Sequence, residues 1–167
     1  TTPARTALDL ACWYPRNDAV VAIDALARAT RLELADVGAL AQRYPGRRNI
    51  VAAREAIDLA DAGSESPQET RLRLLLVDGG LPKPETQIPI FDERGRQVAR
   101  GDMGWEGWKI IVEYDGDHHR TDERQYHGDI LRSERIQAAG WILVRVTAKD
   151  RPGAVLQRVR AAIARRA

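Results

Sequence analysis

Three carboxylates lie close together where two apolar segments of the chain can pair as β-strands. If Glu106-Gly107 forms a two-residue hairpin loop, alternation along the strands places Asp102, Glu113 and Asp115 on one face. Lys109 shares that face, so a positive side chain lies on the same strand as two of the acids. This grouping of charges indicates a site for a cation.

The same hairpin sets Asp102 opposite Ile111, which makes Glu113 a diagonal neighbour of Asp102 across the strand pair. Carboxylates a few ångströms apart raise each other's pKa, and burial raises it further. A hard divalent cation removes that penalty because it prefers oxygen ligands and keeps water molecules for chemistry. We therefore expect Asp102, Glu113 and Asp115 to bind Mg²⁺ or Mn²⁺. The alternative is that these acids lie on a solvated face or in the turn after the strand.

The elements that must position these acids follow from the spacing of apolar residues and from the turn residues between them. Strands are expected at Glu85–Phe91, Gln97–Met103, Trp108–Asp115 and Trp141–Thr147. Helices are expected over residues 66–78, 122–139 and 152–166. The expected order is a helix, a three-strand meander, a helix, a strand and a final helix. This order predicts an α/β (α+β) fold with a mixed sheet flanked by helices.

The first 62 residues carry apolar residues at helical spacing only. The pattern is interrupted near Pro15, Thr30 and Pro45 and predicts a small all-α domain of about four short helices. A turn-rich stretch from Asp61 to Pro67 then marks a boundary, so we expect domains at 1–62 and 63–167.

Composition limits the classes of protein that remain. The chain has 167 residues and a net charge of +2, which does not by itself argue for nucleic-acid binding. Its single Cys excludes an internal disulfide and fits a reducing, cytoplasmic setting. No apolar run is long enough to span a bilayer, so no membrane partner is expected. The first residue is Thr1 and not Met, from which we expect an upstream segment; DNA binding by that segment is implied only by the resemblance of Thr2–Asp9 given below.

Several segments, in this order, resemble an actinobacterial family of uncharacterised proteins related to the very-short-patch-repair (Vsr-like) endonucleases. They are Ser66–Arg71, Gly80–Glu85, Asp102, Lys109–His119, Asp129 to Arg132 and Gly140–Val146. The resemblance covers about Glu65 to Arg160. It implies the PD-(D/E)xK class, which has a restriction-endonuclease-like mixed β-sheet flanked by helices and acts as a metal-dependent nuclease.

The resemblance also implies roles for particular acids. By position, Glu69 matches the acid on a helix, Asp102 the strand Asp, and Glu113 the acid of the third motif. Glu69 is also the third helical residue after Ser66, where a capping box places a carboxylate. The sequence departs from the family pattern two residues after Glu113, where Asp115 stands in place of the expected Lys.

The missing Lys leaves three alternatives. Lys109 replaces its charge from the same strand face, or a His does so, with His119 and His118 as the candidates. His titrates near neutrality and can activate water or protonate a leaving oxygen. The third alternative is a site that has lost its activity.

The expected function is a Mg²⁺-dependent endonuclease acting on DNA, with nucleic-acid contacts from His118, Arg120 and Arg132. The alternative is a catalytically inactive module of the same fold that binds nucleic acid or regulates, in the manner of a toxin–antitoxin protein. An RNA substrate is a further alternative. Residues Thr2–Asp9 resemble segments of antitoxin-like regulators, so the helical domain is expected to be antitoxin-like or a linker. A homodimer would suit cleavage of both strands.

Overall fold

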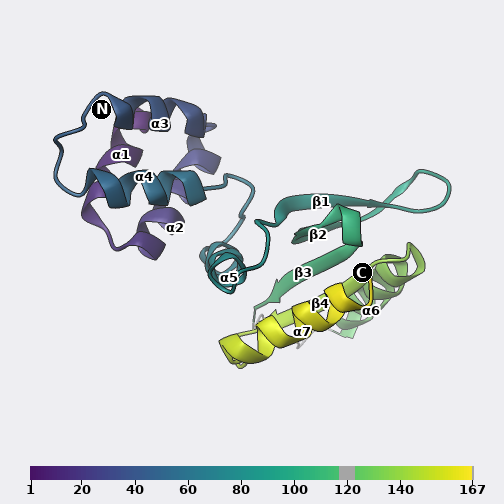
Figure 1. The fold of residues 1–167 in the computed structure, drawn as a ribbon. Helices are drawn as coiled ribbons and strands as arrows, with labels where there is room; N and C mark the ends of the chain where they lie inside the picture. The colour runs from purple at the N-terminus through teal and green to yellow at the C-terminus, as the bar shows by residue number, and fades with distance from the viewer. Residues whose placement is uncertain (117–122, 167) are drawn as a thin grey trace. The chain divides into compact units, whose positions relative to one another are not determined.

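The computed structural model describes residues 1–116 and 123–166, with 123–126 described by their backbone alone (Figure 1). The chain forms two compact units, Thr1–Leu74 and Leu75–Ala167. The first contains the helices α1 (Pro3–Trp13), α2 (Arg16–Thr30), α3 (Leu34–Gln42) and α4 (Ile50–Leu59). Helix α5 (Pro67–Asp78) begins in the first unit and ends in the second.

The first unit is held together by the apolar sides of its helices. The largest of the buried side chains in its core are Leu8, Ile23, Val37, Ile50 and Ile57. At the start of α1, the hydroxyl of Thr2 accepts a hydrogen bond from the backbone N–H of Arg5, which caps the helix. These helices therefore bury one side each against their neighbours, as amphipathic spacing requires.

A buried ion pair ties α5 to α2. Arg73 is 0% exposed, and its Nη2 lies 2.6 Å from Oδ2 of Asp24. Its other nitrogens donate to Oγ of Ser64 and to the carbonyl oxygen of Leu59. The same Asp24 oxygen accepts from the hydroxyl of Thr70 at 2.8 Å. A charged pair so far from water persists because nearly every donor and acceptor around it is used.

This ion pair accounts for where the units divide. The division lies inside α5, between Leu74 and Leu75, and not between residues 62 and 63 as the turn-rich composition suggested. The composition of the 61–67 stretch marks a turn, but it carries no information about which core the following helix joins. The ion pair of Arg73 with Asp24 holds the first two turns of α5 against α2, so these turns belong to the helical unit.

The second unit contains a four-stranded mixed sheet of order β1-β2-β3-β4. Its strands are β1 (Glu85–Phe91), β2 (Gln97–Trp105), β3 (Ile110–Asp115) and β4 (Ile142–Thr147). The first two pairings are antiparallel, and β4 joins β3 in parallel after α6 (Glu123–Ala138). Helix α7 (Pro152–Ala164) follows. The predicted α/β class and its mixed sheet with flanking helices are therefore confirmed.

The two helices of the second unit cover the sheet (Figure 1). Ile136 of α6 packs against Ile88, Ile90 and Ile111 of the sheet. Helix α7 packs against β3 and β4, with Val155 and Val159 among its buried residues. Because neighbouring residues of a strand point to opposite faces, Ile111 is directed to α6 and its neighbours to the α7 face.

The predicted two-residue hairpin loop between β2 and β3 is wrong. Glu106–Trp108 forms a 3-10 turn, and Lys109 follows it in the left-handed conformation with φ of 51°. Trp105 therefore pairs with Ile110, and Asp102 is not opposite Ile111, whose partner is Gly104. Two extra loop residues shift the register, because the backbone N–H of Lys109 bonds to the carbonyl of Glu106 and closes a longer turn.

Gly104 is required by the close approach of β3. A Cβ atom at this position would lie 1.9 Å from the carbonyl oxygen of Ile110, which is backbone and cannot rotate away. Gly104→Ala is expected to lower the free energy of unfolding by about 1–3 kcal/mol. Gly107→Ala in the adjoining turn is the matched control, because nothing lies within 4 Å of its added Cβ. Urea unfolding of both variants measures the difference, and equal midpoints would contradict the packing described.

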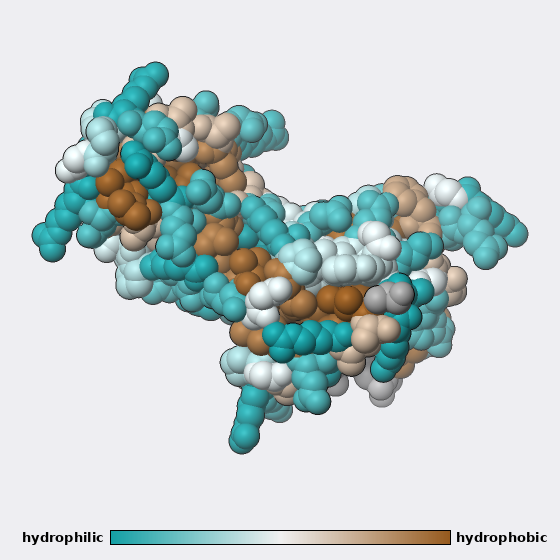
Figure 2. All heavy atoms as spheres, viewed as in Figure 1, coloured by the Kyte–Doolittle hydropathy of each residue, from teal (hydrophilic) through white to brown (hydrophobic). Residues whose placement is uncertain are grey.

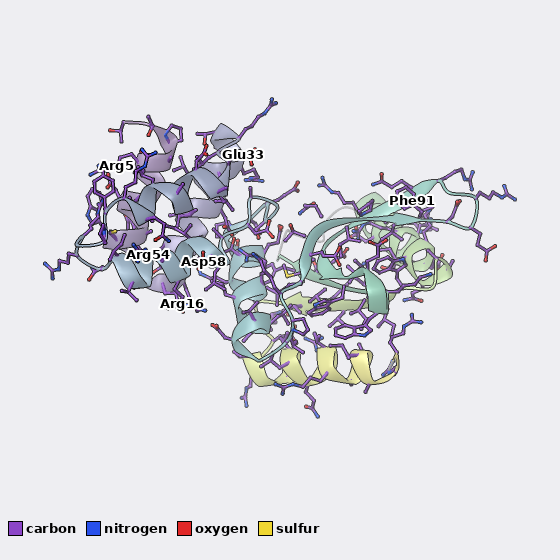
Figure 3. All side chains as sticks on the ribbon, turned by 45° about the horizontal axis from the view of Figure 1, so that its top comes forward. Arg5, Arg16, Glu33, Arg54, Asp58 and Phe91 are labelled. Atoms are coloured by element: carbon purple, nitrogen blue, oxygen red, sulfur yellow. The ribbon has the colours of Figure 1, made fainter. Side chains whose placement is uncertain are left out.

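Hydrophilic residues predominate on the visible face of each unit (Figure 2). Among the large apolar side chains that remain exposed are Trp13, Val51 and Phe91, the last of which lies at the end of β1 (Figure 3). Within the described residues, no helix is both long and apolar enough to cross a membrane.

Candidate functional site

Strands β2 and β3 separate at Asp102. Their ladder of paired residues reaches Met103 and Val112. One step further, the backbone N–H of Tyr114 donates to Oδ2 of Asp102 at 3.1 Å, so a side-chain carboxylate takes the place of a backbone acceptor. The sheet is therefore opened at this point, and the opening is fixed by the acid that the sequence had indicated.

Strand β1 is distorted at the same level. Thr86 pairs with Met103 and Ile88 pairs with Gly101, which leaves Gln87 opposite Asp102. Gln87 has φ of 54°, a conformation that non-glycine residues in strands avoid. Strain of this kind is concentrated at functional sites, where the surrounding structure holds it in place. Nothing in the sequence pattern indicated this distortion.

Glu113 of β3 is paired with Arg132 of α6. The carboxylate is 7% exposed, and its two oxygens accept from Nη1 and Nη2 of Arg132 at 2.8 and 2.6 Å. Nη2 also donates to the carbonyl oxygen of Arg100 on β2 at 2.7 Å. A two-pronged guanidinium–carboxylate pair is among the strong forms of charge-assisted hydrogen bonding, and it fixes the relative orientation of the two side chains.

A second carboxylate acts on the same guanidinium. Hydrogen bonding to Glu113 raises the pKa of Arg132 above its ordinary value, burial opposes the rise, and the charges of Asp102 and Asp129 add to it. Asp102, Glu113 and Arg132 thus form one electrostatic group, which we call the Asp102 cluster. The cluster brings carboxylate oxygens from two strands into the field of one guanidinium.

Asp115 lies at the end of β3, partly buried and beside Thr147 of β4. Alternation directs its side chain to the same face as that of Glu113. Within residues 1–116 and 123–166, no three His, Cys, Asp or Glu side chains gather closely enough to hold a metal ion. The structure therefore brings Asp102 and Glu113 to one guanidinium without joining Asp115 to them as a third ligand.

The prediction that Lys109 shares the strand face of Glu113 is wrong. Lys109 lies in the β2–β3 loop, where its carbonyl accepts from the N–H of Ile142, and its Nζ is directed to Gly140. Four residues of extended chain, about 13 Å, separate it from Glu113. Three further residues of the predicted catalytic and nucleic-acid-binding site lie outside the described residues: His118, His119 and Arg120.

Glu69 forms the predicted capping box at the start of α5. Its Oε2 accepts from the N–H of Glu65 at 2.7 Å and its Oε1 from the hydroxyl of Ser66 at 2.9 Å. In return, the N–H of Glu69 donates to Oγ of Ser66 at 3.1 Å. Glu69 belongs to the Thr1–Leu74 unit, whereas Asp102 belongs to the second. Its cap is therefore established, and its part in a metal site stays a prediction.

Arg132 has a partner that the sequence did not indicate. The structure pairs it with Glu113, and its expected contact with nucleic acid stays a prediction. The sequence offered one signal for this residue, the spacing of Asp129 and Arg132 on one helix. That spacing identifies Arg132 as a candidate site residue but does not identify Glu113 as its partner.

Comparison with known proteins gives relatives without an assigned role. No family model matches the chain, and no solved structure matches it significantly. Its curated relatives include the uncharacterised protein Rv2248 of Mycobacterium tuberculosis strain H37Rv and the uncharacterised protein MT2308 of strain CDC 1551. Each is 33% identical over 162 residues, which cover 95% of this chain and 59% of the relative. The chain thus spans about three-fifths of the length of these relatives.

Proposed function

We propose that this chain is a metal-dependent endonuclease that hydrolyses phosphodiester bonds of DNA and has a restriction-endonuclease-like fold. The observation that carries the proposal is the Asp102 cluster, in which acids from two adjoining strands face a single guanidinium. Two carboxylates at the opening of a mixed sheet offer the oxygen ligands that a divalent cation takes.

The donor chemistry of the cluster fits Mg²⁺ or Mn²⁺, which take oxygen ligands. Asp102 and Glu113 are the proposed ligands, with Asp115 in support. Bound there, the ion would lower the pKa of a water molecule and polarise the scissile phosphate. Each Glu113 oxygen is already bonded to Arg132, so Arg132 must release at least one of them before Glu113 can act as a ligand.

Arg132 is then available to the substrate. A planar guanidinium binds a phosphate with two parallel hydrogen bonds, as it binds Glu113 in the structure. We propose that Arg132 holds the phosphate next to Glu113 and stabilises its developing charge. His119, with His118 as the alternative, is proposed to move the proton, and Arg120 to contact the backbone of the nucleic acid.

A cleavage assay tests the proposal. Single-stranded, duplex and mismatched DNA, and a matched RNA, are incubated with the protein in Mg²⁺, Mn²⁺ or EDTA. Asp102→Asn and Glu113→Gln are expected to reduce cleavage to the level seen in EDTA, because each removes a charged ligand and keeps the shape of the side chain. Glu106→Gln in the β2–β3 turn is the control and should cut like the wild type. Cleavage of the RNA and of none of the DNA substrates would contradict DNA as the substrate and identify RNA in its place.

The closed Glu113–Arg132 pair favours a second candidate, a non-catalytic module that binds nucleic acid or regulates, in the manner of a toxin–antitoxin protein. With both oxygens of Glu113 bonded, the pair serves as a structural link between β3 and α6. Wild-type protein that cuts nothing, and binds DNA equally with and without metal, would favour this candidate. The homodimer, the antitoxin-like role of residues 1–62 and the upstream DNA-binding segment also stay predictions.

A further inference from the structure

Strand β4 forms an edge of the sheet, so one side of its backbone does not face another strand. The N–H of Ile142 donates to the carbonyl of Lys109 at 2.9 Å, towards β3. In a parallel ladder, alternate residues point to the same neighbour, so the backbone groups of Leu143 and Arg145 point the other way. These outward groups are the ones that an additional strand would use.

The second half of this edge is closed by side chains, and its beginning is open. The carbonyl of Arg145 accepts from Nη1 of Arg158 at 2.9 Å, and the N–H of Thr147 donates to Oδ2 of Asp150 at 2.8 Å. Of the described residues, none pairs with the outward N–H and C=O of Leu143. A donor and an acceptor are therefore available near the start of β4.

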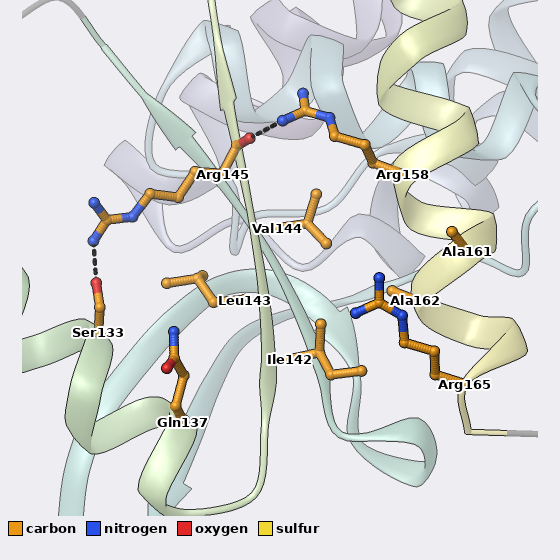
Figure 4. Close-up of a pocket in the computed structure, with 10 residues that line it drawn as sticks. All are labelled: Ser133, Gln137, Ile142, Leu143, Val144, Arg145, Arg158, Ala161, Ala162 and Arg165. Carbon is orange, nitrogen blue, oxygen red and sulfur yellow. Dashed lines mark hydrogen bonds between the residues drawn. The ribbon is translucent and has the colours of Figure 1, made fainter.

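A groove of about 510 Å³ follows this edge between α6 and α7 (Figure 4). Its floor is the apolar stretch Ile142–Val144, and three arginines lie around it: Arg145, Arg158 and Arg165. Arg145 is bonded to Ser133. Arg158 is bonded to the β4 backbone and ion-paired with Asp150 at 2.8 Å, whereas Arg165 points towards the strand. No acidic side chain and no aromatic ring is among the described residues that line the groove.

We propose that the groove binds an extended acidic peptide segment of another protein, which adds to the sheet as a strand beside β4. Main-chain bonds to Leu143 would give affinity, and acidic side chains at alternate positions, which share one face of the added strand, would meet Arg165 on the α7 side of the groove. This proposal goes beyond the nuclease activity and does not depend on it.

Two other occupants fit the groove less well. The sugar–phosphate backbone of single-stranded DNA has no donor for the outward carbonyl of Leu143, and single-stranded nucleic acid usually stacks on aromatic rings, which the described lining lacks. A second copy of β4 would bring the same arginines against one another, and like charges across a strand pair are destabilising. An acidic peptide supplies both the donor and the opposite charge.

Fluorescence anisotropy of the full chain tests the proposal with a fluorescein-labelled peptide of alternating Val and Glu. The expected result is binding that weakens by about tenfold or more when alternate peptide amides are N-methylated, because strand addition needs those N–H groups. Arg165→Glu should weaken binding similarly, and Arg151→Glu, outside the groove, should not. Leu143→Pro removes the outward N–H without breaking the ladder to β3, and should also weaken binding. Thermal melting monitors the fold of each variant.

Three outcomes would overturn the proposal. The first is binding that tolerates N-methylation, which would show attraction by charge alone. The second is equal binding of a Val–Lys peptide, and the third is tighter binding of single-stranded DNA that Arg165→Glu abolishes.

Discussion

Asp24→Ala destabilises the helical unit by about 3–5 kcal/mol, because it leaves Arg73 as an unpaired charge in the core. The guanidinium is 0% exposed, and the carboxylate of Asp24 also accepts from the hydroxyl of Thr70 and the N–H of Asp61. Burial raises the pKa of Asp24, and the charge of Arg73 opposes that rise. Removing the acid therefore leaves three groups without their acceptor: the Arg73 guanidinium, the Thr70 hydroxyl and the Asp61 N–H.

Hydrogen exchange of the full chain measures this loss, since it reports on residues 1–74 separately from the rest. Asp18→Ala is the matched control. Asp18 pairs with Arg71 at 3.4 Å with both side chains more than half exposed, so we expect a loss of about 0–1 kcal/mol. The double variant Asp24→Ala, Arg73→Met should recover much of the stability, because no charge is then left in the core. A double variant less stable than Asp24→Ala would contradict this explanation.

Arg132→Met is expected to have two opposite effects at the Asp102 cluster. Without metal, the protein loses about 1–3 kcal/mol, because Glu113 stays buried without its hydrogen-bond donors. With Mn²⁺ or Mg²⁺, the variant is expected to gain more stability than the wild type, since the ion no longer competes with the guanidinium for Glu113. Cleavage of DNA is expected to fall on the order of 100-fold or more, because the phosphate loses its fixed donor.

Thermal unfolding with and without the ion measures the first two effects. Arg135→Met is the control, because Arg135 lies exposed on the same helix, and its loss should change stability by no more than about 0.5 kcal/mol. Equal metal-induced shifts in the wild type and in Arg132→Met would contradict the competition between Arg132 and the ion.

Local signals were enough to predict the strands and helices. Alternating apolar residues and turn residues located β1 and α5 within a residue of their observed bounds, because both patterns depend on neighbours in the chain. The β2–β3 register was not predictable in this way. It depends on the left-handed conformation of Lys109, and no pattern of side chains identifies a non-glycine residue that adopts it.

The residues of the candidate site were indicated by local signals, but their contacts were not. Asp102 and Glu113 were chosen from spacing and from the resemblance, and the structure bonds Asp102 to the N–H of Tyr114 and Glu113 to Arg132. The pairing of Arg132 with Glu113 joins residues 19 apart, and that of Arg73 with Asp24 joins residues 49 apart. Such pairs depend on how the elements pack, so the sequence supplies the charges but does not say which of them meet.

We propose that Asp102 and Glu113 bind a divalent cation in exchange for Arg132. Titration of the full chain with Mn²⁺, followed by electron paramagnetic resonance of the free ion, tests this exchange most directly. We expect a single saturable site in the wild type that is lost in both Asp102→Asn and Glu113→Gln. A wild type that binds no Mn²⁺, or variants that bind it as tightly as the wild type, would contradict it.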